Sequence, residues 1–168
     1  MCNDLGDEVD LILDGGPCEI GIESTIVDLS RGTPVLLRPG RISAEDMAAT
    51  LGFAPEPVDP GAPRAPGMLE SHYAPRQPMR LVASAQWDDT MRGASPRRGV
   101  LALRPQPVPD LSTIWINAPG HPQDYAHNLY VNLRALDASG CDEIWVEAPP
   151  ATADWAAVRD RLTRASTV

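Results

Sequence analysis

Three side chains that could contact a ligand, Met68, His72 and Tyr73, lie within six residues of one another in a segment with the composition of a linker. The segment 64–78 contains three prolines and one glycine, and it has no apolar period that a helix or strand could bury. Because proline restricts the backbone, we expect a stiff strap rather than a loose tether. Such a strap could close over a site as a lid, with His72 and Tyr73 stacking on a base or reaching a phosphate. In the alternative, Tyr73 only anchors the linker to a domain surface.

A glycine followed by hydroxyl residues marks a second candidate, the segment 21–28 with the sequence Gly-Ile-Glu-Ser-Thr-Ile-Val-Asp. At the start of a strand, Ser24 and Thr25 could present hydroxyl groups to an anion, together with backbone N–H groups. The same pattern also suits an ordinary strand entry, where threonine is favoured by its β-propensity.

Arg38 is the third candidate, because it ends the apolar run Val-Leu-Leu directly before Pro39-Gly40 and the expected start of a helix. Strand ends beside helix starts are where α/β proteins bind anionic ligands. Arginine suits a phosphate, since its planar guanidinium donates two parallel hydrogen bonds and stays charged. A salt bridge to one of the chain's many acids is the alternative.

The cysteines and the remaining histidines form no disulfide or metal-binding pattern. Cys2, Cys18 and Cys141 lie far apart, which fits reduced thiols in the cytosol, although Cys18 could also be a nucleophile. His121 and His127 have no second ligand at metal spacing and are expected at the surface. The sequence also lacks the Gly-x-x-x-x-Gly-Lys of a P-loop.

Composition sets wider bounds. The 168 residues suffice for one ordinary domain or two small ones, and a hydrophobic content of 43% predicts a buried core. The net charge of −9 argues against a nucleic-acid surface, and the only adjacent basic pair, Arg97-Arg98, is expected in a solvated loop. No apolar run is long enough to span a bilayer, and the first residues lack the order of a signal peptide.

The elements that must position these residues fall into two groups. In the first group, strands are expected at 9–13, 24–29 and 34–38, followed by a helix with Ser43 as its N-cap, Asp46 in the capping box and Gly52 at its end. Three short strands and one helix cannot bury both faces of a sheet, so this group looks incomplete.

The second group alternates strands and helices, which predicts a small, mostly parallel α/β layer. Strands are expected at 79–83, 99–103, 113–117 and 143–147, with helices at 85–92 and 125–139 and a last helix whose buried face carries Trp155, Val158 and Leu162.

Four motifs, in this order, closely resemble the two-domain L-threonylcarbamoyladenylate synthases of bacteria and archaea. They are Leu-Ile-Leu-Asp-Gly-Gly at 11–16, the segment 21–29, Leu-Arg-Pro-Gly at 37–40, and Ala-Pro-Gly-Met at 65–68 continuing to His-Tyr-Ala-Pro at 72–75. The segments 126–130, 133–137 and 160–162 are similar to that family's second domain.

The resemblance implies a cytoplasmic nucleotidyltransferase of tRNA modification, which joins L-threonine, bicarbonate and ATP into threonylcarbamoyl-AMP for threonylcarbamoyladenosine and releases pyrophosphate. It implies a YrdC-type α/β domain, an interdomain strap and a small Rossmann-like α/β domain. Carried over by residue, Ser24 contacts L-threonine, Arg38 and Tyr73 bind ATP, and Met68 and His72 are possible lid contacts. Mg²⁺ would accompany ATP, and no motif of the protein dedicated to a metal is expected.

Most of the family's first domain, including its basic nucleotide motif, should precede Met1. We therefore expect 1–54 to be the incomplete end of the catalytic domain, 55–79 the strap and 80–168 the second domain. Such a chain is expected to be inactive without the N-terminal part, which a separate gene could encode. The rival interpretation is a non-catalytic regulatory or binding module derived from that family, with 1–54 as a disordered remnant.

Overall fold

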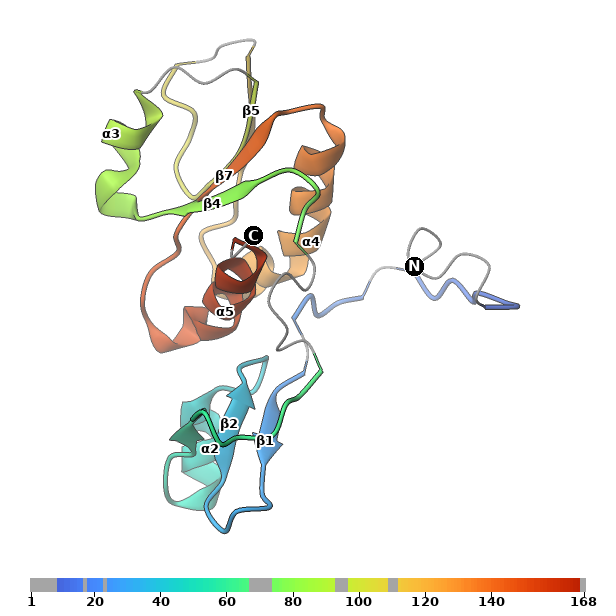
Figure 1. Cartoon of the computed structure of the whole chain (residues 1–168), viewed down its shortest axis with the longest axis vertical. Helices are drawn as coiled ribbons and strands as arrows, with labels where there is room; N and C mark the ends of the chain where they lie inside the picture. The colour runs from blue at the N-terminus through green and yellow to red at the C-terminus, as the bar shows by residue number, and fades with distance from the viewer. Residues whose placement is uncertain are drawn as a thin grey trace.

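The chain builds two sheets from separate stretches of sequence, as seen in a computed structural model that describes residues 9–16, 18–22, 24–66, 74–92, 97–108 and 112–166. One sheet has three strands in the order β1-β2-β3, and the other has four in the order β4-β7-β5-β6. Figure 1 shows the three-stranded unit below the four-stranded unit. Two α/β units along the chain were the expectation from the sequence, and we call them the first and the second unit.

In the first unit, β1 (Ile26–Asp28) pairs antiparallel with β2 (Val35–Arg38), and β2 pairs parallel with β3 (Glu56–Pro57). The short strand β3 lies inside the segment predicted as strap. The strand predicted at 9–13 is wrong, because residues 9–16 form no strand and extend away from both units (Figure 1). A strand needs a partner for its backbone groups, and no strand among the described residues pairs with this segment.

Helix α2 (Ala44–Leu51) begins and ends as its sequence predicts. The Ser43 hydroxyl accepts a hydrogen bond from the Asp46 N–H, and the Asp46 carboxylate accepts one from the Ser43 N–H, which completes the capping box. Gly52 ends the helix in the left-handed region at φ 82°. None of the helix residues is fully buried, and Ala44, Met47 and Ala48 are half-buried, so the first unit covers one face of this helix only in part.

The second unit is a parallel α/β layer, as predicted. All strand pairs in it are parallel. In chain order its elements are β4 (Met79–Val82), the 3-10 turn η2 (Ser84–Gln86), α3 (Trp87–Met91), β5 (Arg98–Ala102), β6 (Thr113–Asn117), α4 (Pro122–Ala138), β7 (Glu143–Glu147), η3 (Ala153–Trp155) and α5 (Ala156–Ala165).

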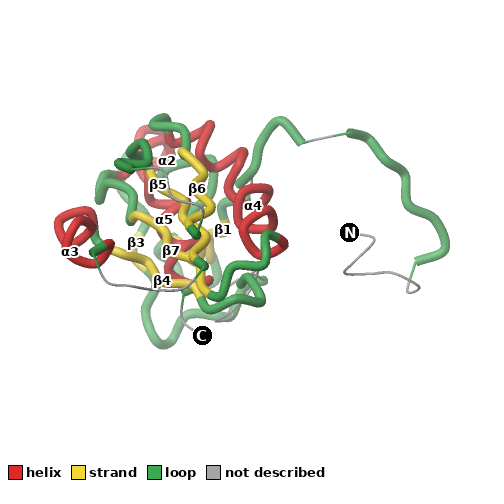
Figure 2. Tube along the Cα trace, turned by 90° about the horizontal axis from the view of Figure 1, so that it is seen from above, coloured by secondary structure: helices red, strands yellow, loops and turns green. Residues whose placement is uncertain are grey.

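Helices cover both faces of this sheet, as buried parallel strands require. On one face, Leu129 of α4 and Leu162 of α5 pack with Leu101 and Ile144 in the main core. On the other face, Trp87 of α3 packs with Val100 and its strand neighbours. Figure 2 shows α3 and α4 on opposite sides of the strands.

Two local predictions in this unit need correction. Helix α4 begins three residues earlier than predicted, because Pro122 at its first position already has the backbone angle of a helix. Arg98 is not in a solvated loop. It starts β5, is 6% exposed, and its guanidinium lies 4.3 Å from the centre of the Trp145 ring, where the indole face stabilises a buried cation.

Candidate functional site

The β1–β2 pairing brings two of the predicted site residues to one end of the first sheet. Ile26 lies opposite Arg38, so the start of β1, just after Ser24, meets the carboxyl end of β2. Ser24 is exposed and Arg38 is half-buried. The pairing of β1 with β2 therefore places the residue with the hydroxyl, Ser24, near the residue with the guanidinium, Arg38.

The backbone around Ser24 is held tightly by residues 40–42. A Cβ added to Gly40 would lie 2.4 Å from the carbonyl carbon and oxygen of Ser24 and 2.5 Å from the Thr25 nitrogen, so only glycine fits here. The Thr25 hydroxyl donates to the Ile42 carbonyl at 2.9 Å and accepts from the Ile42 N–H at 3.1 Å. Thr25, rather than Ser24, thus serves as the structural hydroxyl of the segment.

The Arg38 guanidinium connects β2 to the beginning of the strap. Its Nη1 donates to the Pro66 carbonyl oxygen at 2.6 Å. Its Nε is buried and has no hydrogen-bond partner among the described residues. Within those same ranges Arg38 forms no salt bridge. Met68, His72 and Tyr73 lie outside the described residues.

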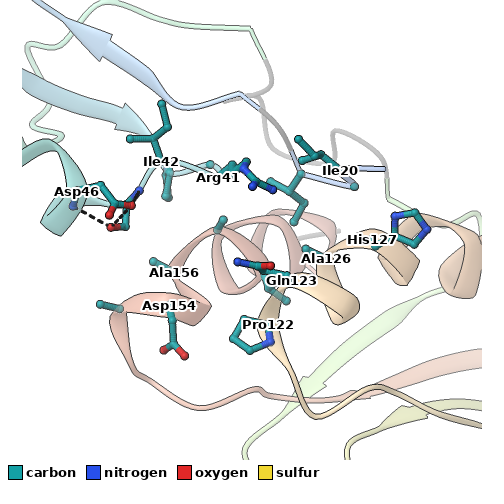
Figure 3. Close-up of a pocket in the computed structure, with 18 of the residues that line it drawn as sticks. Ile20, Arg41, Ile42, Asp46, Pro122, Gln123, Ala126, His127, Asp154 and Ala156 are labelled. Carbon is teal, nitrogen blue, oxygen red and sulfur yellow. Dashed lines mark hydrogen bonds between the residues drawn. The ribbon is translucent and has the colours of Figure 1, made fainter. Parts of the chain in front are cut away.

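A cavity of about 990 Å³ lies between the two units (Figure 3). Its walls come from residues 19–22, from 39–46, and from the starts of α4 and α5. It is lined by one arginine, Arg41, and by five acids, namely Glu19, Glu45, Asp46, Asp124 and Asp154. Ser24 and Arg38 are not among its lining residues, but Pro39 and Gly40, which directly follow Arg38, are. The cavity therefore borders the end of the sheet where Ser24 and Arg38 meet.

Most of the acids that line the cavity lie in the first turns of helices, which accounts for their presence there. Glu45 and Asp46 lie in the first turn of α2, and Asp124 lies in the first turn of α4, where a negative charge complements the helix dipole. Hydrogen bonds from the Ser43 hydroxyl and N–H lower the pKa of Asp46. In the part of the chain that the structure describes, no group of three His, Cys, Asp or Glu side chains could hold a metal ion.

Contacts between the units involve residues that sequence reasoning missed. The Arg161 guanidinium of α5 donates from Nη2 to the Pro39 carbonyl at 3.2 Å, and His127 Nδ1 of α4 lies 3.0 Å from the Glu19 carbonyl oxygen. Ile22 is buried in the core of the second unit. A single sequence carries no signal for such pairs, because the partners lie more than 100 residues apart.

A buried carboxylate joins three strand ends of the second unit. Glu147 accepts hydrogen bonds from the Ser84 hydroxyl at 2.9 Å, the Leu103 N–H at 3.0 Å and Arg104 Nη2 at 2.7 Å. Burial by itself raises the pKa of Glu147, but the hydrogen bonds and charge of Arg104, with Ser84 and Leu103, outweigh it and hold the pKa below its ordinary value. Because both carboxylate oxygens of Glu147 accept hydrogen bonds, we interpret this cluster as structural rather than as a binding site.

None of the described helices has both the length and the apolar character needed to cross a membrane.

The chain matches family models and known proteins. The family model described as threonylcarbamoyl-AMP synthase, C-terminal domain, matches residues 42–167, and a second, described as telomere recombination, matches residues 1–40. A threonylcarbamoyl-AMP synthase of Bacillus subtilis is 32% identical over 99% of this chain and 51% of its own length. The Pyrococcus abyssi threonylcarbamoyl-AMP synthase is 29% identical over 99% of this chain and 52% of its own length.

A solved structure agrees with these matches. The crystal structure of P. abyssi Sua5 complexed with L-threonine superposes with a TM-score of 0.76 at 26% identity, over 98% of this chain and 52% of that one. The chain thus spans about half the length of the relatives it matches. On the family match over residues 42–167, the chain belongs to the threonylcarbamoyl-AMP synthase family.

Proposed function

We propose that this chain supplies the C-terminal part of an enzyme that forms threonylcarbamoyl-AMP from L-threonine, bicarbonate and ATP, for the threonylcarbamoyladenosine modification of tRNA. The observation that carries the proposal is the β1–β2 register, which brings the Ser24 segment beside Arg38 in a member of this family. The names of the relatives and the L-threonine complex of the P. abyssi protein support it.

Ser24 is the proposed contact for L-threonine. Ser24 is exposed two residues before the start of β1, while the hydroxyl of the neighbouring Thr25 is hydrogen-bonded to the backbone of Ile42. A rigid backbone that carries an exposed serine suits the recognition of a small polar amino acid, because the protein loses little conformational entropy when the ligand binds.

Arg38 is the proposed contact for an ATP phosphate. The Pro66 carbonyl uses its Nη1, and the buried Nε has no partner among the described residues. A buried donor without an acceptor is unfavourable by about 1–3 kcal/mol, so an anionic oxygen placed there would be stabilised. In the reaction, a guanidinium at the phosphates would offset the charge that develops as pyrophosphate leaves.

Tyr73, with His72 and Met68, is the proposed lid over the nucleotide. One related structure is of a P. abyssi Sua5 variant in which an adjacent histidine and tyrosine are both replaced by alanine. His72-Tyr73 is the only such pair in this sequence, and we propose that it is the counterpart. Closure of the strap would exclude water from the labile carbamate of threonine.

Mg²⁺ would enter with ATP and offset the charge of its phosphates. Four of the five acids that line the cavity lie at helix starts, and Glu19 lies on the segment 19–22 rather than at the end of β2, so we assign none of them to the metal. Arg38 would share the phosphate charge with the ion. We also propose a cytoplasmic location, because ATP, threonine and tRNA occur together there.

A complementing polypeptide is part of this proposal. Helix α2 has no fully buried residue, and several large apolar side chains of the first unit are exposed, namely Leu29, Leu51, Phe53 and Val58. Such a surface is typical of a domain that is completed by further strands and helices. The added part would also supply the cations that ATP needs beyond Arg38.

Complementation tests the proposed function. The chain is co-expressed with the part of the Bacillus subtilis relative that it does not cover, and the purified complex is assayed for threonylcarbamoyl-AMP by mass spectrometry. We expect product from the complex and none from either part alone. Product from this chain alone would disprove the need for a complement. A stable, folded complex without product would favour the rival interpretation, a non-catalytic binding module.

A further inference from the structure

We propose that the second unit positions the Ser24 segment for substrate binding, and that Arg161 is the positioning residue that acts on it through Pro39. The inference rests on the proposed function for the role of Ser24. It goes beyond that function by assigning a task in threonine recognition to α4 and α5, which contribute no group to the proposed site.

The first contact lies three residues before Ser24, at Gly21. A Cβ added to Gly21 would come within 2.0 Å of the Ala126 carbonyl oxygen and 2.4 Å of the His127 Cα, so the backbone of Gly21 lies directly on α4. The next side chain, Ile22, is 5% exposed and packs in the core of the second unit with residues such as Leu129 and Leu162. The approach to Ser24 is therefore fixed by α4 and not by the first sheet.

A histidine of α4 adds a directional contact to this approach. His127 Nδ1 lies 3.0 Å from the Glu19 carbonyl oxygen, a geometry in which Nδ1 carries the proton and donates. Figure 3 shows His127 on α4 below the segment that carries Ile20. Together with the contacts of Gly21 and Ile22, it holds the segment 19–22 against the second unit.

The second contact acts on the other side of Ser24. Arg161 of α5 donates from Nη2 to the Pro39 carbonyl at 3.2 Å, and its Nη1 is ion-paired with Asp160. The Arg161 side chain is only 9% exposed, so its charge is held in one orientation. Pro39 precedes Gly40, whose backbone packs on the carbonyl of Ser24. A shift of Pro39 would therefore be transmitted to Ser24 through backbone contact.

The contacts with α4 and with α5 restrain the Ser24 segment on both sides. Residues 19–22 are held by α4 and residue 39 by α5, while Thr25 and Ile42 close the loop between them. Arg38, although next to Pro39, has two further restraints that do not involve Arg161, namely strand pairing and the hydrogen bond to Pro66. Loss of the Arg161 contact should thus disturb the threonine site more than the ATP site.

The test uses the complemented enzyme with Arg161→Ala, Arg161→Lys and Arg161→Met. We expect Arg161→Ala to raise the KM for L-threonine about tenfold, the low end for the loss of a charge-assisted hydrogen bond, with less effect on the KM for ATP. Arg161→Lys should restore part of the loss, because it keeps one donor. Arg161→Met keeps an apolar side chain of similar length, so it replaces Arg161→Ala in the assay if that variant does not fold.

The matched control is Arg159→Ala on the same helix. Arg159 donates to a carbonyl within its own unit, that of Pro149, at 2.8 Å. Its loss removes an arginine–carbonyl bond of the same kind and should leave the KM for threonine unchanged. An equal rise in both variants would mean that the effect is loss of helix stability, which would overturn the positioning role.

A second readout separates this inference from the proposed function. Amide hydrogen exchange is followed in the chain alone, which needs no activity. We expect faster exchange at residues 24–28 and 39–43 in Arg161→Met than in the wild type, with β5 and β7 unchanged. Unchanged exchange in these segments, with an unchanged KM for threonine, overturns the inference. If the complemented wild type makes no product, the proposed function fails, and exchange alone then decides the positioning role.

Discussion

The guanidinium of Arg38 donates a hydrogen bond of 2.6 Å to the carbonyl oxygen of Pro66, which joins the end of β2 to the start of the strap. The two residues are 28 positions apart, so the contact links the strand that presents the proposed phosphate contact to the segment that leads to His72 and Tyr73. The proposed phosphate contact and the position of Pro66 thus depend on the same side chain.

Replacing Arg38 separates these two roles. Lysine at this position could keep the single bond to Pro66 but would lose the planar fork that a phosphate uses. We expect Arg38→Lys to lower kcat/KM for ATP in the complemented enzyme roughly ten- to a hundredfold, the usual loss for a charge-assisted contact. Steady-state kinetics measure it, with thermal unfolding as the check on folding. Wild-type kinetics in Arg38→Lys would restrict Arg38 to holding the strap.

Gly21→Ala should separate the two units without unfolding the second. The new methyl group would collide with the backbone of α4 at the Ala126 carbonyl, which a rotamer change cannot relieve. Undocking would also expose Ile22, whose burial stabilises by about 1.5–3 kcal/mol. Limited proteolysis should show faster cleavage between the units. Gly120→Ala is the matched control, since no atom lies within 4 Å of its added Cβ, and similar cleavage of both variants would contradict the docking.

The lowered pKa of Glu147 predicts how the free energy of unfolding depends on pH. Its pKa in the folded state lies below the ordinary value of 4.5, so its ionised form stabilises the fold at neutral pH. That contribution is lost as the pH falls through the folded-state pKa. We expect Glu147→Gln to cost about 1–3 kcal/mol near pH 7 and to flatten the acid dependence of unfolding. Urea titrations from pH 3 to 7 test this, with exposed Glu45→Gln as the control, and parallel pH curves for wild type and Glu147→Gln would refute it.

The second unit should fold by itself. A chain shortened to residues 74–168 retains both sides of its parallel sheet and the helices that cover them. It loses only Ile22 from the main core, so we expect a cooperative thermal transition at a lower temperature than in the whole chain. Circular dichroism measures it. A gradual, non-cooperative loss of signal would mean that the first unit is needed for this fold.

Local sequence signals predicted the elements that depend on local physics. The capping box at Ser43 and the left-handed Gly52 fix α2, and the alternation of strands and amphipathic helices gives the second layer. The strands at 113–117 and 143–147 have the predicted bounds, because turn residues flank β-branched and aromatic runs there.

Predictions that depend on distant partners were less complete. The apolar run at 9–13 has the pattern of a strand, but it pairs with no strand in the part of the chain that the structure describes. Arg98 reads as a loop residue because its charge suggests exposure, whereas the Trp145 ring covers it. The contacts of Arg161 and His127 with the first unit depend on how two units dock, which the pattern along a helix does not encode.

The most direct test of the central claim is pyrophosphate exchange into ATP by the complemented enzyme. If the chain completes a threonylcarbamoyl-AMP synthase, labelled pyrophosphate should enter ATP only when both L-threonine and bicarbonate are present, because the carbamate of threonine is the group that attacks the α-phosphate. Exchange that needs threonine but not bicarbonate, or no exchange from a folded complex, would contradict the account.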